Sequence, residues 1–91
     1  LGDVYKRQML QIHYMAKLRE ELDVSNERID WAGGTVDELL NVLRGRGEPW
    51  QSTLSPANVY KVAVNQEIVH DFQAQVAPDA EVAILPPVTG G

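Results

Sequence analysis

A single amphipathic helix, set among short β-runs, is the feature that most restricts how this chain can fold. Thr35 followed three residues later by Glu38 forms a capping box, a pattern typical of a helix N-terminus. Gly45 or Gly47 then ends the predicted helix, and Arg44 in its last turn suits the helix dipole. Its apolar side chains fall on one stripe, so the helix must pack against another element. These residues are Val36, Leu39, Leu40 and Leu43.

The β-runs on both sides of this helix predict that the other element is a sheet. Met9–Met15 alternates, with Leu10, Ile12 and Tyr14 on one face and Gln11 and His13 on the other. Further strands are expected at 27–31, 59–64, 67–69 and 81–85, with 59–64 as a central strand. Asn65-Gln66 is expected to form a turn and 70–76 a loop. A short helix is expected at 16–22, and 48–57 reads as an irregular crossover that buries Trp50 or Leu54.

This order of elements, β-β-α-β-β-β, predicts an α+β fold in which one helix covers one face of a mixed sheet. The first and last strands would lie parallel in the middle of that sheet if both share the helix-packing face. Such an arrangement is the β-grasp fold, as in ubiquitin.

Composition excludes several classes of function. The 91 residues include no cysteine, which rules out disulfides, thiolate metal sites and a cysteine nucleophile. A net charge of −5 argues against nucleic-acid binding, which needs a basic face. The apolar runs are far shorter than the roughly 20 residues of a membrane span, and together with the lack of cysteine this favours the cytoplasm. Neither His13 nor His70 has ligands at metal-binding spacing, so we expect no metal and no self-contained active site.

The two ends of the chain are expected to lie outside the domain. Residues 1–8 show neither the alternation of a strand nor the period of a helix, so we interpret them as a non-native leader. Met9 is then the native start, and the domain spans 9–85. At the other end, Pro86 and Pro87 end the last strand because proline fixes φ and donates no hydrogen bond. Val88 and Thr89 follow, and Gly90 and Gly91 could enter a channel too narrow for other residues. Residues 86–91 are therefore predicted to be a protruding tail.

The ending Leu85-Pro86-Pro87-Val88-Thr89-Gly90-Gly91 resembles that of the sulfur-carrier (small) subunits of molybdopterin synthase, in the ubiquitin-like MoaD/ThiS family. The resemblance continues through Val62-Ala63-Val64-Asn65-Gln66 and Glu81-Val82-Ala83, and reaches Tyr14–Glu20, with Trp50 at a frequent aromatic position. It thus covers Met9 to Gly91. The chain departs from the family at Ile84-Leu85, where aromatics are frequent, and at Ala80, where glycine is common.

What the resemblance implies is a sulfur carrier in molybdenum cofactor biosynthesis. The Gly91 carboxylate would be activated with ATP by a ubiquitin-activating-type adenylyltransferase and converted to a thiocarboxylate. The tail would enter the large synthase subunit, which would supply the catalytic groups, and give its sulfur to a cyclic pyranopterin phosphate. The family also implies a heterotetramer with that subunit. The carrier itself would bind no cofactor.

Within the tail, Gly91 is the expected site of modification, Gly90 provides clearance, and Pro86 to Thr89 set the direction. Val82 and Ile84 are expected in the core. Leu85, Pro86 and Val88 could form an exposed apolar rim for docking, and for Leu85 a place in the core is an equal alternative. Two alternative functions stay open: a carrier for the thiazole pathway or for protein modification, and a ubiquitin-like binding module whose tail is never activated.

Overall fold

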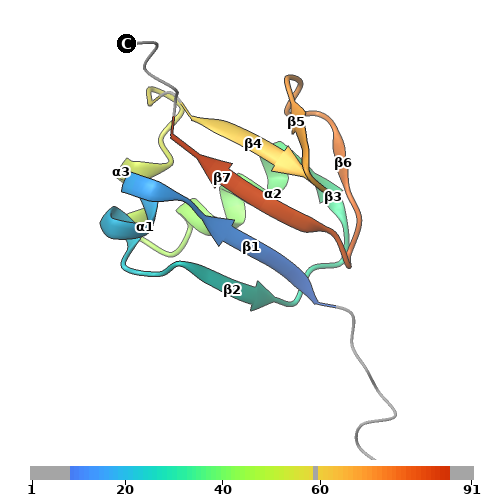
Figure 1. Ribbon diagram of the computed structural model, residues 1–91, viewed down its shortest axis with the longest axis horizontal. Helices are drawn as coiled ribbons and strands as arrows, with labels where there is room; N and C mark the ends of the chain where they lie inside the picture. Colours follow the sequence, from blue (N-terminus) through green and yellow to red (C-terminus); the bar gives the residue numbers. More distant parts are fainter. Residues whose placement is uncertain (1–8, 59, 87–91) are drawn as a thin grey trace, which may run out of the picture.

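The computed structural model describes residues 9–58 and 60–86, which form a five-stranded mixed sheet with helices on one face (Figure 1). The strand order is β2-β1-β7-β4-β5. The first and last strands are parallel neighbours in the middle of the sheet, and the other pairs are antiparallel. The strands are β1 (Leu10–Tyr14), β2 (Asn26–Ile29), β4 (Lys61–Val64), β5 (Glu67–Val69) and β7 (Glu81–Leu85). The α+β class and the β-grasp arrangement are therefore confirmed.

The main helix, α2 (Val36–Arg44), crosses behind the sheet in Figure 1. Its capping box is complete: the Glu38 N–H donates to Thr35 Oγ1 at 3.1 Å, and the Thr35 N–H donates to Glu38 Oε1 at 2.8 Å. Two shorter helices, α1 (Ala16–Leu22) and α3 (Trp50–Thr53), lie together at one end of the sheet. The apolar stripe predicted for α2 is fully buried, as are the β-strand residues that face it.

One continuous core lies between the sheet and the helices. It takes alternate residues of β1 and β7, the stripe of α2, and Leu54 from the crossover. Trp50 is partly buried against it, so both side chains expected to tuck into the core do so. Leu18 and Leu22 of α1 close the end of the core. The fully buried residues of the five-stranded sheet are Leu10, Ile12, Tyr14, Val62, Val82 and Ile84.

Several boundaries differ from those expected. A second, two-stranded sheet joins β3 (Gly34–Thr35) to β6 (Gln75–Val76), the latter within residues 70–76, which were predicted to form a loop. These two strands are far apart in the sequence, and each is too short to show the alternating pattern that predicts a strand. The crossover contains the single turn α3 instead of being wholly irregular. β2 ends at Ile29 instead of Trp31, whose indole Nε1–H donates to the Val76 carbonyl at 3.1 Å.

The ends of the chain bear on two of the predictions. Residues 1–8 and 87–91 lie outside the described residues, so the non-native leader, the start at Met9 and the protruding tail stay predictions. Within 9–58 and 60–86, no helix is long and apolar enough to cross a membrane.

Candidate functional site

The site proposed from the sequence begins where β7 ends. Leu85 is the last strand residue and Pro86 the last described residue, and both are half-buried. This end of β7 lies beside α1 and α3 in Figure 1. The other predicted site residues, Pro87, Val88, Thr89, Gly90 and Gly91, fall outside the described residues, and their roles stay predictions.

The strand that leads to Pro86 is held on both sides. β7 pairs in parallel with β1, where Tyr14 lies opposite Ile84, and antiparallel with β4, where Lys61 lies opposite Leu85. Beyond the end of β1, the Met15 N–H donates to the Ile84 carbonyl at 3.1 Å. Val82 and Ile84 point into the core, as predicted. The last described residues therefore leave a central strand whose position is fixed up to its final residue.

On the helical side of Pro86 lies a hollow of about 260 Å³. Lys17, Leu18 and Glu21 of α1 form one wall, and Pro86 itself is part of the lining. The Lys17 ammonium lies 3.8 Å from the Glu21 carboxylate, and both side chains are well exposed. The rest of the lining comes from Thr53, Asn58 and Tyr60.

Among residues 9–58 and 60–86, no helix lies on the opposite side of the sheet, and we call that side the open face. Strand alternation and register place on it the residues between the buried ones. His13 lies opposite Ala83, Ala83 opposite Ala63, and Ala63 opposite Ile68, in one row across the sheet. Met15 and Ile68 are each 43% exposed. The open face consists of Gln11, His13, Met15, Asn26, Arg28, Lys61, Ala63, Ile68, Glu81, Ala83 and Leu85.

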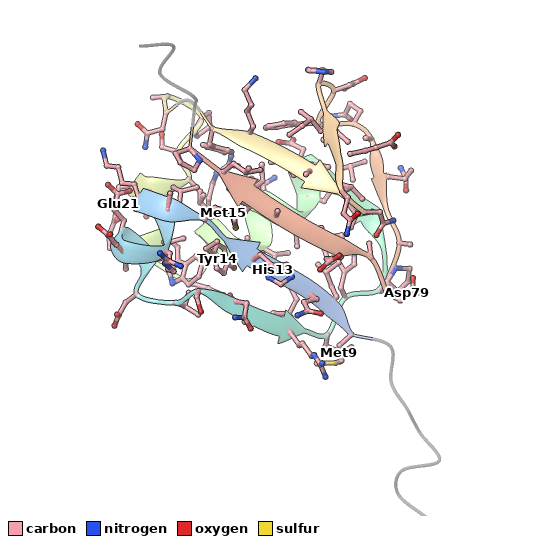
Figure 2. The ribbon with its side chains drawn as sticks, viewed as in Figure 1. Met9, His13, Tyr14, Met15, Glu21 and Asp79 are labelled. Carbon is pink, nitrogen blue, oxygen red and sulfur yellow. The ribbon has the colours of Figure 1, made fainter. Side chains whose placement is uncertain are left out.

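A shallow hollow of about 250 Å³ occupies the middle of the open face. Ala83 is one of its lining residues, and its small side chain keeps the surface low there. Met15, His13, Glu81 and Gln66 complete the lining. Figure 2 shows the His13 and Met15 side chains beside each other at β1 and its end. Because Leu85 continues this face to the residue before Pro86, the open face runs up to the point where the predicted tail begins.

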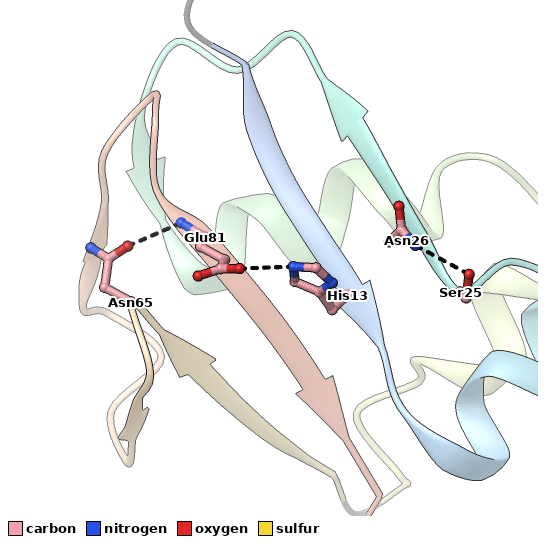
Figure 3. Close-up of polar contacts among 5 residues, drawn as sticks. All are labelled: His13, Ser25, Asn26, Asn65 and Glu81. Atoms are coloured by element: carbon pink, nitrogen blue, oxygen red, sulfur yellow. Dashed lines mark hydrogen bonds and ion pairs between the residues drawn. The ribbon is translucent and has the colours of Figure 1, made fainter.

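Two polar side chains, His13 and Glu81, interrupt the apolar part of the open face (Figure 3). His13 Nε2 and Glu81 Oε2 lie 2.9 Å apart, across the parallel pair β1–β7. The Glu81 backbone is fixed as well, since its N–H donates to Asn65 Oδ1 at 3.0 Å and its carbonyl accepts from the Asn65 N–H at 2.7 Å. The side chains of His13 and Glu81 are 31% and 46% exposed, so water reaches both.

On the helical side, a second polar cluster joins β1 and β2 to the segment after α2. The Tyr14 hydroxyl donates to Glu27 Oε2 at 2.6 Å, and Arg46 donates to both Glu27 oxygens, at 2.8 and 3.0 Å. The Arg46 guanidinium lies 4.5 Å from the centre of the Trp50 ring, which meets Tyr14 edge-on. Each group in the cluster is satisfied by another, and the arrangement is that of a structural network.

Electrostatics within this network are strongly coupled. Burial, the hydrogen bond to Glu27 and its negative charge raise the pKa of Tyr14 well above its ordinary value, so the phenol stays a neutral donor. Burial alone would raise the pKa of Glu27, but hydrogen bonds from Arg46 and Tyr14 outweigh it, and the pKa lies below the usual 4.5. Glu27 is therefore ionised at neutral pH.

The residues considered for other chemistry are not brought together. Within 9–58 and 60–86, no three histidine or acidic side chains gather at a geometry that could hold a metal ion. His13 pairs with Glu81, and His70 lies exposed just after β5. The expectations that the carrier binds no metal and no cofactor stay predictions.

Comparison with known proteins identifies what kind of chain this is. The sequence matches the ThiS family over residues 12–91, almost its whole length. The chain belongs to the ThiS family. Its members, together with the MoaD type, are sulfur carriers, so the resemblance drawn from the tail and its upstream residues is confirmed.

Individual relatives are more distant. The molybdopterin synthase sulfur carrier subunit of Haemophilus influenzae is 29% identical over 83 residues, which cover 91% of this chain and 100% of that protein. Among solved structures, SAMP1 from Haloferax volcanii is 25% identical, with a TM-score of 0.71 over 91% of this chain and 99% of that one. The complex of subunits 1 and 2 of molybdopterin-converting factor from Helicobacter pylori contains a chain that is 22% identical, with a TM-score of 0.65 over 91% and 99%. This last likeness supports the fold alone.

Sequence reasoning missed the open-face hollow and the His13–Glu81 pair. The two residues are 68 positions apart and meet only through the parallel register of β1 and β7. The alternation of Met9–Met15 did place His13 on the face away from the core, which was the one available signal. The apolar rim expected at Leu85 and Pro86 is half-buried in the structure, and Met15 and Ile68 extend it.

Proposed function

We propose that this protein is the sulfur-carrying small subunit of molybdopterin synthase. The observation that carries the proposal is the ending Pro86-Pro87-Val88-Thr89-Gly90-Gly91, on a chain that aligns with the Haemophilus influenzae carrier along that protein's full length. Gly91 is the modified residue. Gly90 and the residues from Pro86 to Thr89 deliver it to the partner.

The chemistry requires nothing of this chain except a free terminal carboxylate. Attack of the Gly91 carboxylate on the α-phosphorus of ATP releases pyrophosphate and gives an acyl-adenylate. A persulfide donor then displaces AMP to give an acyl disulfide, and a second thiol reduces its S–S bond, which leaves the thiocarboxylate and a disulfide on the donor. Adenylation matters because a carboxylate repels nucleophiles, whereas its mixed anhydride with AMP has a good leaving group. The adenylyltransferase and the large synthase subunit supply the acids, bases and phosphate-binding cations.

The shape of the described residues supports this role. A partner that accepts a chain leaving Pro86 must lie against the end of β7, where Leu85 and Met15 present apolar surface on the open face. Ala83 and Ile68 continue this apolar surface across the sheet. Such a surface beside a reactive terminus is typical of protein docking. We propose that the large synthase subunit covers the open face while it holds the tail, in a heterotetramer with two carriers.

Mass spectrometry of the intact protein tests the proposal. After incubation with the cognate adenylyltransferase, ATP and a sulfur source, the carrier should gain the mass difference between sulfur and oxygen at its terminus. Deleting Gly91, or adding one residue after it, should abolish molybdopterin formation from the cyclic pyranopterin phosphate and leave the thermal midpoint unchanged. A control substitution on α3, Gln51→Ala, should retain activity. Full activity in either tail variant would refute the assignment.

A second candidate function is a carrier that modifies proteins, and the likeness to SAMP1 favours it. A thiazole-pathway carrier is a further alternative. The carrier with a thiocarboxylate at Gly91 distinguishes these three functions. Consumption of the thiocarboxylate by the large subunit with cyclic pyranopterin phosphate supports the molybdopterin assignment. Transfer to the thiazole precursor, or attachment of Gly91 to lysines of other proteins, would support a rival. A terminus that never gains sulfur would indicate a binding module.

A further inference from the structure

The His13–Glu81 pair stands where a partner on the open face would exclude water from it. Both residues line the same 250 Å³ hollow as Met15 and Ala83. In the free carrier the pair is partly hydrated, with 31% and 46% of the two side chains exposed. Docking that covers Ala83 and Leu85 on one strand necessarily approaches Glu81, which lies two residues before Ala83 on the same face of β7.

Removal of that water changes which charge state of the pair is stable. An ionised carboxylate taken out of water without a counter-charge is strongly destabilised, and a hydrogen-bonded counter-ion offsets part of that penalty. His13 is the basic side chain that lies at contact distance from Glu81, at 2.9 Å. Histidine is the side chain that gains or loses its charge between pH 5 and 8, so it can supply that counter-charge by taking up a proton.

The surroundings of His13 contain few other cationic side chains that could neutralise the Glu81 carboxylate in its place. Its cross-strand neighbour on β2 is Asn26, which is uncharged, and the next step of that register brings Arg28 opposite Gln11. On β7 the neighbours are Glu81 and Ala83, and the turn after β4 contributes Gln66 to the hollow. Arg28 is therefore the nearest cation by register, and it is aligned with Gln11 instead of His13.

We infer that the His13–Glu81 pair takes up one proton when the large synthase subunit covers the open face, so that the carrier binds more tightly as the pH falls. The inference rests on the proposed function. Because the complex holds more protons than the separate proteins, linkage requires the dissociation constant to rise with pH, by up to about tenfold per pH unit for one proton. The pair thus sets a pH dependence for docking that the apolar residues alone would not have.

Isothermal titration calorimetry of the full-length carrier with the large subunit from the same genome tests this. At one pH near 7.5, measurements in phosphate, HEPES and Tris give the number of protons taken up from the dependence of the binding heat on buffer ionisation. We expect a net uptake that approaches one proton for the wild type. The uptake should vanish in Glu81→Gln, which removes the carboxylate, and in His13→Gln, which removes the base.

The chain supplies a matched control, because its other histidine, His70, lies exposed beyond β5. His70→Gln should keep the proton uptake of the wild type, and circular dichroism should show all three variants folded. Binding without proton uptake, or uptake that survives in both His13→Gln and Glu81→Gln, would overturn the inference and leave the proposed function standing. Absence of any binding by the wild type would overturn the partner assignment and this inference with it.

Discussion

The hydroxyl of Tyr14 donates a 2.6 Å hydrogen bond to Glu27 Oε2, which ties a fully buried residue of the central strand β1 to a charged residue of the edge strand β2. Arg46 completes the link by donating to both oxygens of the same carboxylate. The network joins three segments that hydrophobic packing alone would hold less specifically. It also explains how a tyrosine can occupy a core position, because its one polar atom has a partner.

Removal of that hydroxyl should weaken the fold without disturbing its shape. Tyr14→Phe keeps the ring against Trp50 and deletes a hydrogen bond to a charged acceptor, so we expect the free energy of unfolding to fall by about 1.5–3 kcal/mol. Urea denaturation followed by circular dichroism measures the difference. An unchanged midpoint would show that water replaces the hydroxyl at no cost.

The lowered pKa of Glu27 predicts a specific acid sensitivity. A carboxyl whose pKa is depressed in the folded state stabilises the fold above its unfolded value, near 4.5, and loses that contribution as the pH falls through the folded value. Wild type should therefore be more stable than Glu27→Gln at pH 6–7, and the difference should shrink toward pH 3. Denaturation curves of both proteins across this range test it. A difference that grows on acidification would contradict the network.

The packing of α2 predicts a large loss of stability for one substitution on this helix and almost none for another. Leu39 is fully buried between α2 and the sheet, so Leu39→Ala should lower the free energy of unfolding by about 2–5 kcal/mol through lost burial and a cavity. Val42 on the same helix is 51% exposed, and Val42→Ala should change the free energy of unfolding by less than about 0.5 kcal/mol. Thermal unfolding of the two variants compares them directly, and equal losses would mean that α2 is misplaced.

The open face predicts a loss of partner binding that is separate from stability. Ile68→Glu places a charge on an apolar, 43% exposed position of that face, and we expect the dissociation constant for the large subunit to rise at least about tenfold, or 1.4 kcal/mol. Val42→Glu puts the same charge at a comparably exposed site on the helical side and should leave binding unchanged. Calorimetry measures both. Equal affinities would exclude the open face as the docking surface.

Local patterns predicted most of the elements correctly because each of them depends on neighbouring residues. The alternation of Met9–Met15, the bounds of α1 and β5, and the capping box of α2 all follow from spacings shorter than one element. The two-residue strands β3 and β6 escaped prediction because each pairs with a segment about 40 residues away in the sequence. Val59 was expected to begin a strand, but it lies outside the described residues, and the strand described begins at Lys61.

The sequence by itself determined the fold class, the core-facing residues and the family, because periodicity, capping and a short terminal motif are all written in consecutive positions. Only the tertiary structure decided which residues share a surface. The parallel register of β1 and β7 brings His13 to Glu81, and the antiparallel register of β4 and β5 brings Ala63 to Ile68. Shifting a strand by one residue would turn each of these side chains to the opposite face, so the composition of the open face depends on register. Register is fixed by the packing of the whole core, which no single stretch of sequence contains.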